Sequence, residues 1–96
     1  FRAYGVGNAH RHLPEMRDSL ARLGGTCDLL FTPHLLPVDR GILSTITVPL
    51  AAPLADPLGV LRDAYAHEPF VEITDALPAL QDVVHRNVVR ITAVPV

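Results

Sequence analysis

The chain has 96 residues, 49% of them hydrophobic, and a formal net charge of −2. This length fits one small domain, and the slight negative charge argues against a nucleic-acid-binding surface. One cysteine excludes a disulfide scaffold and favours a reducing compartment such as the cytoplasm. No hydrophobic run approaches the roughly 20 residues that cross a bilayer, so we expect no membrane partner. A mean hydropathy of +0.28 indicates apolar surface that a partner subunit or further domain covers.

The N-terminal quarter predicts a short strand over residues 1–7, followed by one helix in PEMRDSLARLGG, residues 14–25. Pro14 suits the first helical turn, and a Gly-Gly pair ends the helix. Asp18 and Arg22 are expected to pair on the exposed face. The apolar face has the helical spacing and consists of Leu13, Met16, Leu20 and Leu23.

The middle of the chain is predicted to be extended. In CDLLFTPHLLP, residues 27–37, two prolines restrict the segment to an edge or bulged strand. The run ILSTITVPL, residues 42–50, is the clearest strand prediction because its side chains alternate. One face of this strand carries Ile42, Ile46, Val48 and Leu50.

The second half predicts another helix and further strands. Asp56 and Pro57 form an N-cap and first-turn proline, followed by Leu58, Leu61 and Tyr65 facing a core. A short strand is expected in EPFVEIT, a loop in DALPALQD, and one or two strands from VVHRNVVRITAVPV to the last residue. The predicted fold is α+β, with two helices packed on a mostly antiparallel sheet. A chain that lacks an initial Met and stops in a strand is expected to be part of a longer polypeptide.

The stretch GNAHRHLPEM, residues 7–16, carries the residues most suited to chemistry. His12 directly precedes the predicted helix, and the partial positive charge of a helix N-terminus favours a neutral imidazole that can accept a proton. The same helix end favours a nearby anion, such as a thiolate or a phosphoryl oxygen. Glu15 is close enough to orient an imidazole N–H or a ligand amine. These residues suit acyl or phosphoryl chemistry.

Two other interpretations of the histidines stay open. His-x-His on an extended segment is a common zinc half-site, but none of His34, His67 and His85 stands at a recognisable ligand spacing. We therefore expect no metal site. In the simpler interpretation, His10 and His12 cap the helix and bond to the backbone.

Two motifs resemble the N-acetyl-γ-glutamyl-phosphate reductase family. They are AYGVGNAHRHLPEM, residues 3–16, and FTPHLLPVDRGILSTITVPL, residues 31–50. The His-Arg-His-x-Pro-Glu core and the Pro-His-Leu-x-Pro-x-x-Arg-Gly-Ile-Leu-x-Thr run are specific to that family, and they occur in the expected order. EPFV, residues 68–71, fits a third segment, and the resemblance covers roughly residues 3–87.

The resemblance implies a fold and an activity. The family is similar to aspartate-semialdehyde dehydrogenase, with an N-terminal Rossmann domain and an α+β domain like that of the semialdehyde and glyceraldehyde-phosphate dehydrogenases. Residues 1–96 would then be a single α+β catalytic and dimerisation domain, inactive alone, of a homodimer or homotetramer. The implied reaction is reduction of N-acetyl-γ-glutamyl phosphate by NADPH to the semialdehyde and phosphate, in arginine biosynthesis. The NADP-binding domain and the nucleophilic cysteine would lie outside this chain.

The resemblance also implies roles for individual residues. His12 corresponds to the family's acid–base histidine. His10 and Glu15 would orient it or hold substrate, and Tyr4 would approach the same pocket. Arg11 would bind the substrate carboxylate or phosphate through paired hydrogen bonds. Tyr4 could equally be a packed strand residue.

Further implied roles and departures lie outside this stretch. Arg40 is a second candidate for the carboxylate or phosphate, or a turn residue tied to Asp39. Asn87 would contact the cofactor, although His85 and Arg86 stand where the family favours Gly and Ser or Thr. Cys27 is expected to be an ordinary core or strand thiol.

Two alternative functions remain. One is the aminoadipyl-phosphate reductase of lysine biosynthesis, whose substrate differs by one methylene group. The other is a non-catalytic dimerisation module that uses the apolar face of residues 42–50. The sequence leaves the choice between NADP and NAD open.

Overall fold

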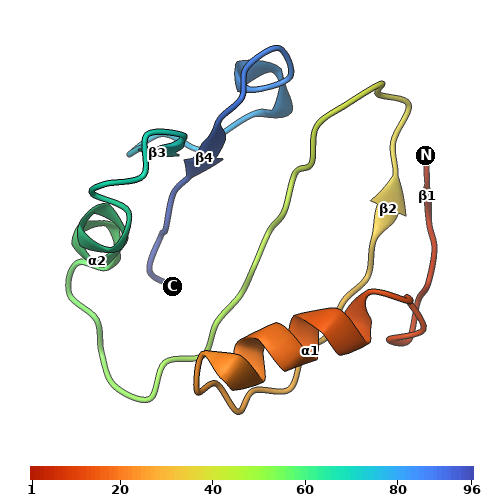
Figure 1. Cartoon of the computed structure of the whole chain (residues 1–96), viewed down its shortest axis with the longest axis horizontal. Helices are drawn as coiled ribbons and strands as arrows, with labels where there is room; N and C mark the ends of the chain where they lie inside the picture. Colours follow the sequence, from red (N-terminus) through yellow and green to blue (C-terminus); the bar gives the residue numbers. More distant parts are fainter. The chain divides into compact units, whose positions relative to one another are not determined.

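The computed structural model describes all 96 residues, which form two compact units, residues 1–38 and 39–96. The first unit contains β1, α1 and β2, and the second contains α2, β3, the short 3-10 helix η1 and β4 (Figure 1). Two helices and small sheets agree with the predicted α+β class. None of the helices is long and apolar enough to cross a membrane.

In the first unit, two very short strands pair. Strand β1 (Arg2–Ala3) runs antiparallel to β2 (His34–Leu35), and Tyr4 N–H extends the pairing by donating to the Pro33 carbonyl at 3.1 Å. The strand predicted over residues 1–7 is therefore confirmed only at its start. The edge strand predicted over residues 27–37 reduces to two residues, because the prolines on either side of β2 cannot donate to a ladder.

Helix α1 (Leu13–Arg22) forms where it was predicted. It has a proline in its first turn, and Asp18 and Arg22 pair at 2.8 Å between Oδ2 and Nη2. Gly25 N–H donates to the Leu20 carbonyl at 2.8 Å after Gly24 takes φ +81°. These contacts confirm the predicted glycine stop, since glycine enters the left-handed region at little cost.

The apolar face of α1 is only partly buried. Leu13 is 2% exposed, and Met16 and Leu20 are half-buried. Leu23, predicted to share this face, is 85% exposed. The prediction is wrong there because Leu23 is already the C-cap, where the helix ends.

The strongest strand prediction, residues 42–50, is wrong. All nine residues are exposed and lack ladder hydrogen bonds. The alternating sequence favours an extended chain, but a strand needs a neighbouring backbone about 4.7–4.9 Å away. No segment of the second unit lies alongside at that spacing.

Helix α2 (Pro57–Ala64) in the second unit starts at its predicted cap. The Asp56 Oδ1 atom accepts the Gly59 N–H at 2.8 Å. Leu58 and Leu61 are half-buried as predicted, whereas Tyr65 is 39% exposed because it lies at the C-cap.

Strands β3 (Val71–Ile73) and β4 (Val89–Ile91) pair in parallel, with Glu72 opposite Arg90. The predicted mostly antiparallel sheet is therefore only partly confirmed, since one ladder is antiparallel, the other is parallel, and the two form separate sheets. Parallel neighbours require a crossover connection, and this one contains η1 (Leu80–Asp82) where a loop was predicted. Strand β4 ends at Ile91, so the predicted C-terminal strand is shorter than expected.

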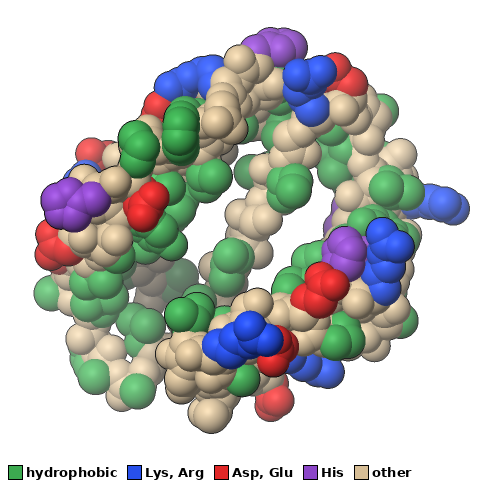
Figure 2. Space-filling model, in the orientation of Figure 1, with side chains coloured by type: hydrophobic (Ala, Val, Ile, Leu, Met, Phe, Trp, Pro, Cys, Tyr) green, Lys and Arg blue, Asp and Glu red, His purple; other side chains and the backbone are tan.

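Hydrophobic side chains reach the surface throughout the visible face of the molecule (Figure 2). Leu13 is the only hydrophobic residue that is fully buried. A monomeric domain rarely leaves this much apolar surface in contact with water. The most exposed large side chains outside the chain ends are Ile42, Leu23, Leu30, Ile46 and Leu77.

Candidate functional site

The loop before α1 is a tight turn built on left-handed backbone. Gly5, Gly7 and Asn8 have φ values of +56°, +73° and +60°. A β-carbon on Gly5 would lie 3.0 Å from the β-carbon of His10, so the loop folds closely onto this histidine. Residue 5 must adopt a left-handed backbone and leave room for His10, and glycine can do both because it has no side chain.

The side chain of Asn8 joins this loop to a segment more than twenty residues away. Asn8 Nδ2 donates to the Leu29 carbonyl at 2.9 Å, and Phe31 N–H donates to Asn8 Oδ1 at 2.9 Å. One amide thus satisfies a backbone acceptor and a backbone donor of residues 29–31. We call this pair of hydrogen bonds the Asn8 clamp.

Three rings surround His10 edge to face. The ring centroids of Tyr4, Phe31 and His12 lie 5.2, 5.3 and 4.9 Å from that of His10, at interplanar angles of 67°, 79° and 75°. Edge-to-face contacts at 4.5–7 Å are the favourable geometry for aromatic pairs. The structure therefore brings three of the predicted site residues, Tyr4, His10 and His12, into one cluster.

His12 is the N-cap residue of α1, but its side chain makes no capping hydrogen bond. Its backbone N–H instead donates to His10 Nδ1 at 3.2 Å. An accepting Nδ1 carries a lone pair, so neutral His10 bears its proton on Nε2. The simpler interpretation of the histidines is half right, since His10 bonds to the backbone and His12 leaves its ring nitrogens free.

The remaining predicted site residues of the first unit are exposed. Arg11 lies between the two histidines, and Glu15 lies in the first turn of α1. The side chain of neither forms an ion pair or hydrogen bond. Both are free to meet a ligand at the helix start.

The other two predicted site residues belong to the second unit. Arg40 Nε lies 3.8 Å from Asp39 Oδ2, and both side chains are exposed. This contact matches the predicted alternative of a turn residue tied to Asp39. Asn87 is exposed, and its amide makes no hydrogen bond. Cys27, in the first unit, is a free and exposed thiol that lies outside every strand, so the prediction of a core or strand thiol is wrong.

A charged cluster in the second unit was not predicted. Arg86 donates to Glu72, and Arg90 Nη2 lies 2.8 Å from Glu72 Oε2 and Arg90 Nη1 3.3 Å from Asp82 Oδ2. Hydrogen bonds from Arg86 and then Arg90 lower the pKa of Glu72, and the bond to Glu72 raises the pKa of Arg90. The signal that could have revealed this cluster is the register of β3 and β4, because opposite charges that face each other across two strands stabilise the pairing of those strands.

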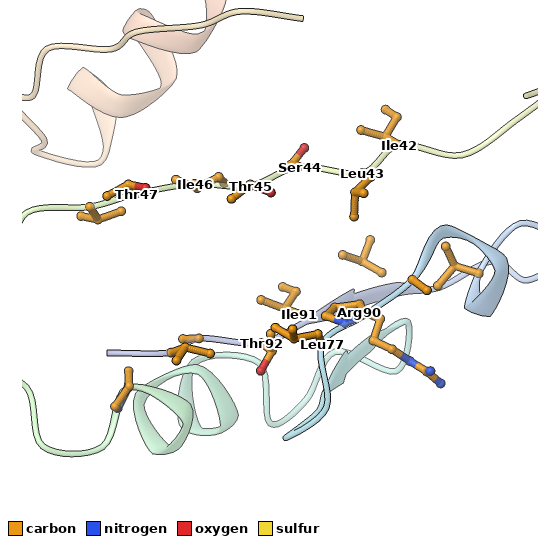
Figure 3. Close-up of a pocket in the computed structure, with 18 of the residues that line it drawn as sticks. Ile42, Leu43, Ser44, Thr45, Ile46, Thr47, Leu77, Arg90, Ile91 and Thr92 are labelled. Carbon is orange, nitrogen blue, oxygen red and sulfur yellow. The ribbon is translucent and has the colours of Figure 1, made fainter. Parts of the chain in front are cut away.

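A large cleft opens within the second unit. Residues 42–47 lie on one side of it and Arg90, Ile91 and Thr92 on the other (Figure 3). The extended segment starts at Gly41, which lies against the side chains of Leu80 and Val84. The cleft measures about 2050 Å³, whereas small-molecule sites usually occupy roughly 300–1,000 Å³. Its volume therefore exceeds that of a usual small-molecule site, and its lining is mostly apolar.

No cluster of three or more His, Cys, Asp or Glu side chains that could hold a metal ion is present. The closest histidine pair, His10 and His12, is therefore without a third potential ligand. The chemical groups available at the helix start are imidazole, guanidinium and carboxylate.

A family model described as "Semialdehyde dehydrogenase, dimerisation domain" matches residues 1–95. Proteins named N-acetyl-gamma-glutamyl-phosphate reductase are similar to the chain. The protein from Pelobacter propionicus is 51% identical over 76 residues, which are 76% of this chain and 22% of that protein. The protein from Rhodopirellula baltica is 45% identical over 101 residues, which are 97% of this chain and 29% of that protein. No solved structure matches.

The chain spans about a quarter of the length of the curated relatives it matches. The match to the Rhodopirellula baltica protein covers nearly the whole chain and therefore extends over both units. The match of 95 residues to the family model extends over all the described elements. The chain therefore belongs to the semialdehyde dehydrogenase dimerisation-domain family.

Proposed function

We propose that the chain is the catalytic and dimerisation part of an N-acetyl-γ-glutamyl-phosphate reductase. This enzyme would reduce N-acetyl-γ-glutamyl phosphate to the semialdehyde and release phosphate, in arginine biosynthesis. The names of the relatives, which are 45–51% identical to the chain, support the activity. The observation that carries the chemistry is the His10–His12 pair at the start of α1, where His12 has both ring nitrogens free.

In this proposal His12 moves a proton. Its neutral imidazole takes the proton from a nucleophilic cysteine thiol supplied elsewhere in the polypeptide. The thiolate then attacks the acyl carbon, the carbon–oxygen bond to phosphate breaks, and a thioester forms. His12 returns the proton when the reduced product leaves. The N-terminus of α1 favours the anions that arise in both steps.

NADPH supplies the hydride when it is bound. Most of its binding surface would belong to a separate N-terminal domain. Asn87 fits a supporting contact because its exposed amide makes no hydrogen bond. Arg86, by contrast, is engaged by Glu72 and is not free for the cofactor.

Arg11 and Arg40 are the proposed anion-binding residues. A guanidinium group donates two parallel hydrogen bonds to a carboxylate or phosphate. Arg11 has no ion pair and lies beside both histidines, so it is the stronger candidate. Arg40 keeps only a 3.8 Å contact with Asp39, which a substrate anion could replace. Glu15 and Tyr4 complete the proposed site, Glu15 by orienting an N–H group and Tyr4 through its contact with His10.

The second unit would provide the subunit interface of a homodimer or homotetramer. The exposed apolar residues of 42–50 and the cleft beside them support this part of the proposal. Burial of this apolar surface between subunits would contribute about 25 cal/mol per Å² to the free energy of association. An exposed free thiol at Cys27 fits a reducing compartment such as the cytoplasm.

The direct test is an assay of the full-length protein that contains this chain. We expect NADPH oxidation that depends on N-acetyl-γ-glutamyl phosphate and, in reverse, phosphate-dependent reduction of NADP with the semialdehyde. Absence of both reactions in a folded protein would contradict the proposal and favour a non-catalytic dimerisation module. The assay with NAD in place of NADP identifies the preferred cofactor.

The same assay with the aminoadipyl homologue tests the substrate. One methylene group changes transition-state binding by about 1–3 kcal/mol, which is roughly 10–200-fold in kcat/KM. We expect the glutamyl substrate to be preferred within that range. A preference for the aminoadipyl substrate would reassign the enzyme to lysine biosynthesis.

A further inference from the structure

We propose that Asn8 is a positioning residue for the histidine pair. It touches no reacting atom and acts through the Asn8 clamp, which fixes residues 29–31 against the loop that carries His10 and His12. This inference rests on the proposed function of His12. The contacts that support it form one continuous path.

The path begins at the backbone of Asn8. Its φ of +60° lies in the left-handed region, which asparagine tolerates better than most residues. Glycine would satisfy the turn equally well, as Gly5 and Gly7 do nearby. The asparagine amide adds something that glycine lacks, namely two 2.9 Å hydrogen bonds to backbone groups 21 and 23 residues away.

The path continues through Phe31. Its N–H is held by Asn8 Oδ1, and its ring packs edge to face on His10 with centroids 5.3 Å apart. The Asn8 clamp is the only hydrogen-bonded tie between loop 5–12 and residues 29–31. Without it, the nearest hydrogen bond that holds Phe31 in place is the one from Tyr4 N–H to the Pro33 carbonyl, two residues further along the chain.

The path ends at His12. His10 Nδ1 accepts the His12 N–H at 3.2 Å, so the plane of the His10 ring fixes the backbone at the N-cap of α1. The His12 ring in turn packs on His10 at 4.9 Å. A small displacement of His10 therefore moves the imidazole that exchanges protons, and misplacement by about 1 Å can cost 10²-fold in rate.

Two variants of the full-length enzyme separate the clamp from the turn. Asn8→Gly keeps the left-handed backbone and removes both hydrogen bonds. Asn8→Asp keeps the acceptor for Phe31 N–H but replaces the donor to Leu29 with a second oxygen. We expect kcat to fall about 10–100-fold in Asn8→Gly, with KM within about threefold of the wild type, and less in Asn8→Asp.

A double variant tests whether Asn8 acts through His10. If it does, Asn8→Gly causes no further loss of kcat in a His10→Ala background, because coupled residues are non-additive. A full additional loss would overturn the proposed path. Asp56→Ala is the matched control, since it removes a similar side-chain-to-backbone bond from the second unit and should leave kcat unchanged.

Nitrogen-15 NMR of the histidine rings supplies a readout that needs no turnover. In the wild type we expect His10 in the Nε2–H tautomer, and in Asn8→Gly a mixture of tautomers. An unchanged kcat, a loss confined to KM, or an unchanged tautomer in Asn8→Gly would each contradict the inference. An inactive wild type with the expected tautomer change would contradict the proposed function alone.

Discussion

The two units of this chain arrange their polar and apolar side chains in different ways. In the first unit, an asparagine, two histidines and two aromatic rings converge through short polar and edge-to-face contacts. In the second, the charged residues neutralise one another in the Glu72 cluster, while the apolar residues 42–50 face a cleft. The difference shows that polar and aromatic contacts order the first unit around His10, whereas the second unit leaves much of its apolar surface exposed.

We expect the largest effect from a substitution that removes the proposed catalytic group of the first unit. His12→Ala in the full-length enzyme should lower kcat by about 10²–10⁴-fold, because a general acid–base residue typically contributes that factor. Steady-state assays with N-acetyl-γ-glutamyl phosphate measure it. His67→Ala is the control, since His67 is an exposed histidine of the second unit without a proposed role. Equal activity of the two variants would refute the assignment of His12.

We expect the next largest effect from a charged substitution in the apolar surface of the second unit. Ile46→Asp should weaken self-association at least 10-fold, because burying an isoleucine side chain contributes about 1.5–3 kcal/mol. Ile46 is 78% exposed, so the substitution leaves no internal cavity. Sedimentation equilibrium of the full-length protein measures the dissociation constant. The matched variant Val60→Asp, on the exposed side of α2, should associate normally. An unchanged constant for Ile46→Asp would exclude this surface as the interface.

A smaller effect concerns local stability in the second unit. Asp56→Ala should lower the free energy of opening of α2 by about 1 kcal/mol, since the helix loses its N-cap acceptor. Hydrogen exchange of the amides in the first turn of α2 reports this change. Exchange in α1 serves as the internal reference, because that helix has no side-chain cap to lose. Unaltered protection of α2 would show that the cap contributes nothing.

The smallest effect concerns pH. Arg86 and Arg90 lower the pKa of Glu72 below its usual value of 4.5. Its ion pairs therefore stabilise the fold fully above that value, and the stabilisation is lost as the pH falls through the folded-state pKa. In urea unfolding, the wild type should exceed Glu72→Gln in stability at neutral pH, and the difference should shrink in acid. A difference that stays constant to pH 2 would contradict this linkage.

Features encoded by local sequence could be predicted, and features that depend on distant neighbours could not. The start of α2 at Asp56 and the end of α1 at a Gly-Gly pair follow from the chemistry of a few adjacent residues. The prediction of a strand at residues 42–50 was wrong because alternating side chains specify an extended chain but do not specify a neighbouring backbone. The parallel pairing of β3 with β4 was missed for the same reason, since no local signal sets the direction in which two distant strands pair.

The same distinction between local and distant features applies to the candidate site. The position of His12 at a helix start could be predicted from Pro14 and the apolar spacing that follows. The Asn8 clamp could not, because its partners lie 21 and 23 residues away and are backbone atoms, which carry no sequence signature. The contact of Phe31 with His10 depends on that clamp and was missed with it.

Proton transfer by the His12 imidazole underlies the proposed mechanism. Its decisive test is the turnover of His12→Ala in the full-length enzyme with and without added imidazole. We expect free imidazole to restore part of the lost kcat in His12→Ala and none in Asn8→Gly, where the side chain is present but displaced. Turnover of His12→Ala at the wild-type level, or equal restoration in both variants, would contradict it.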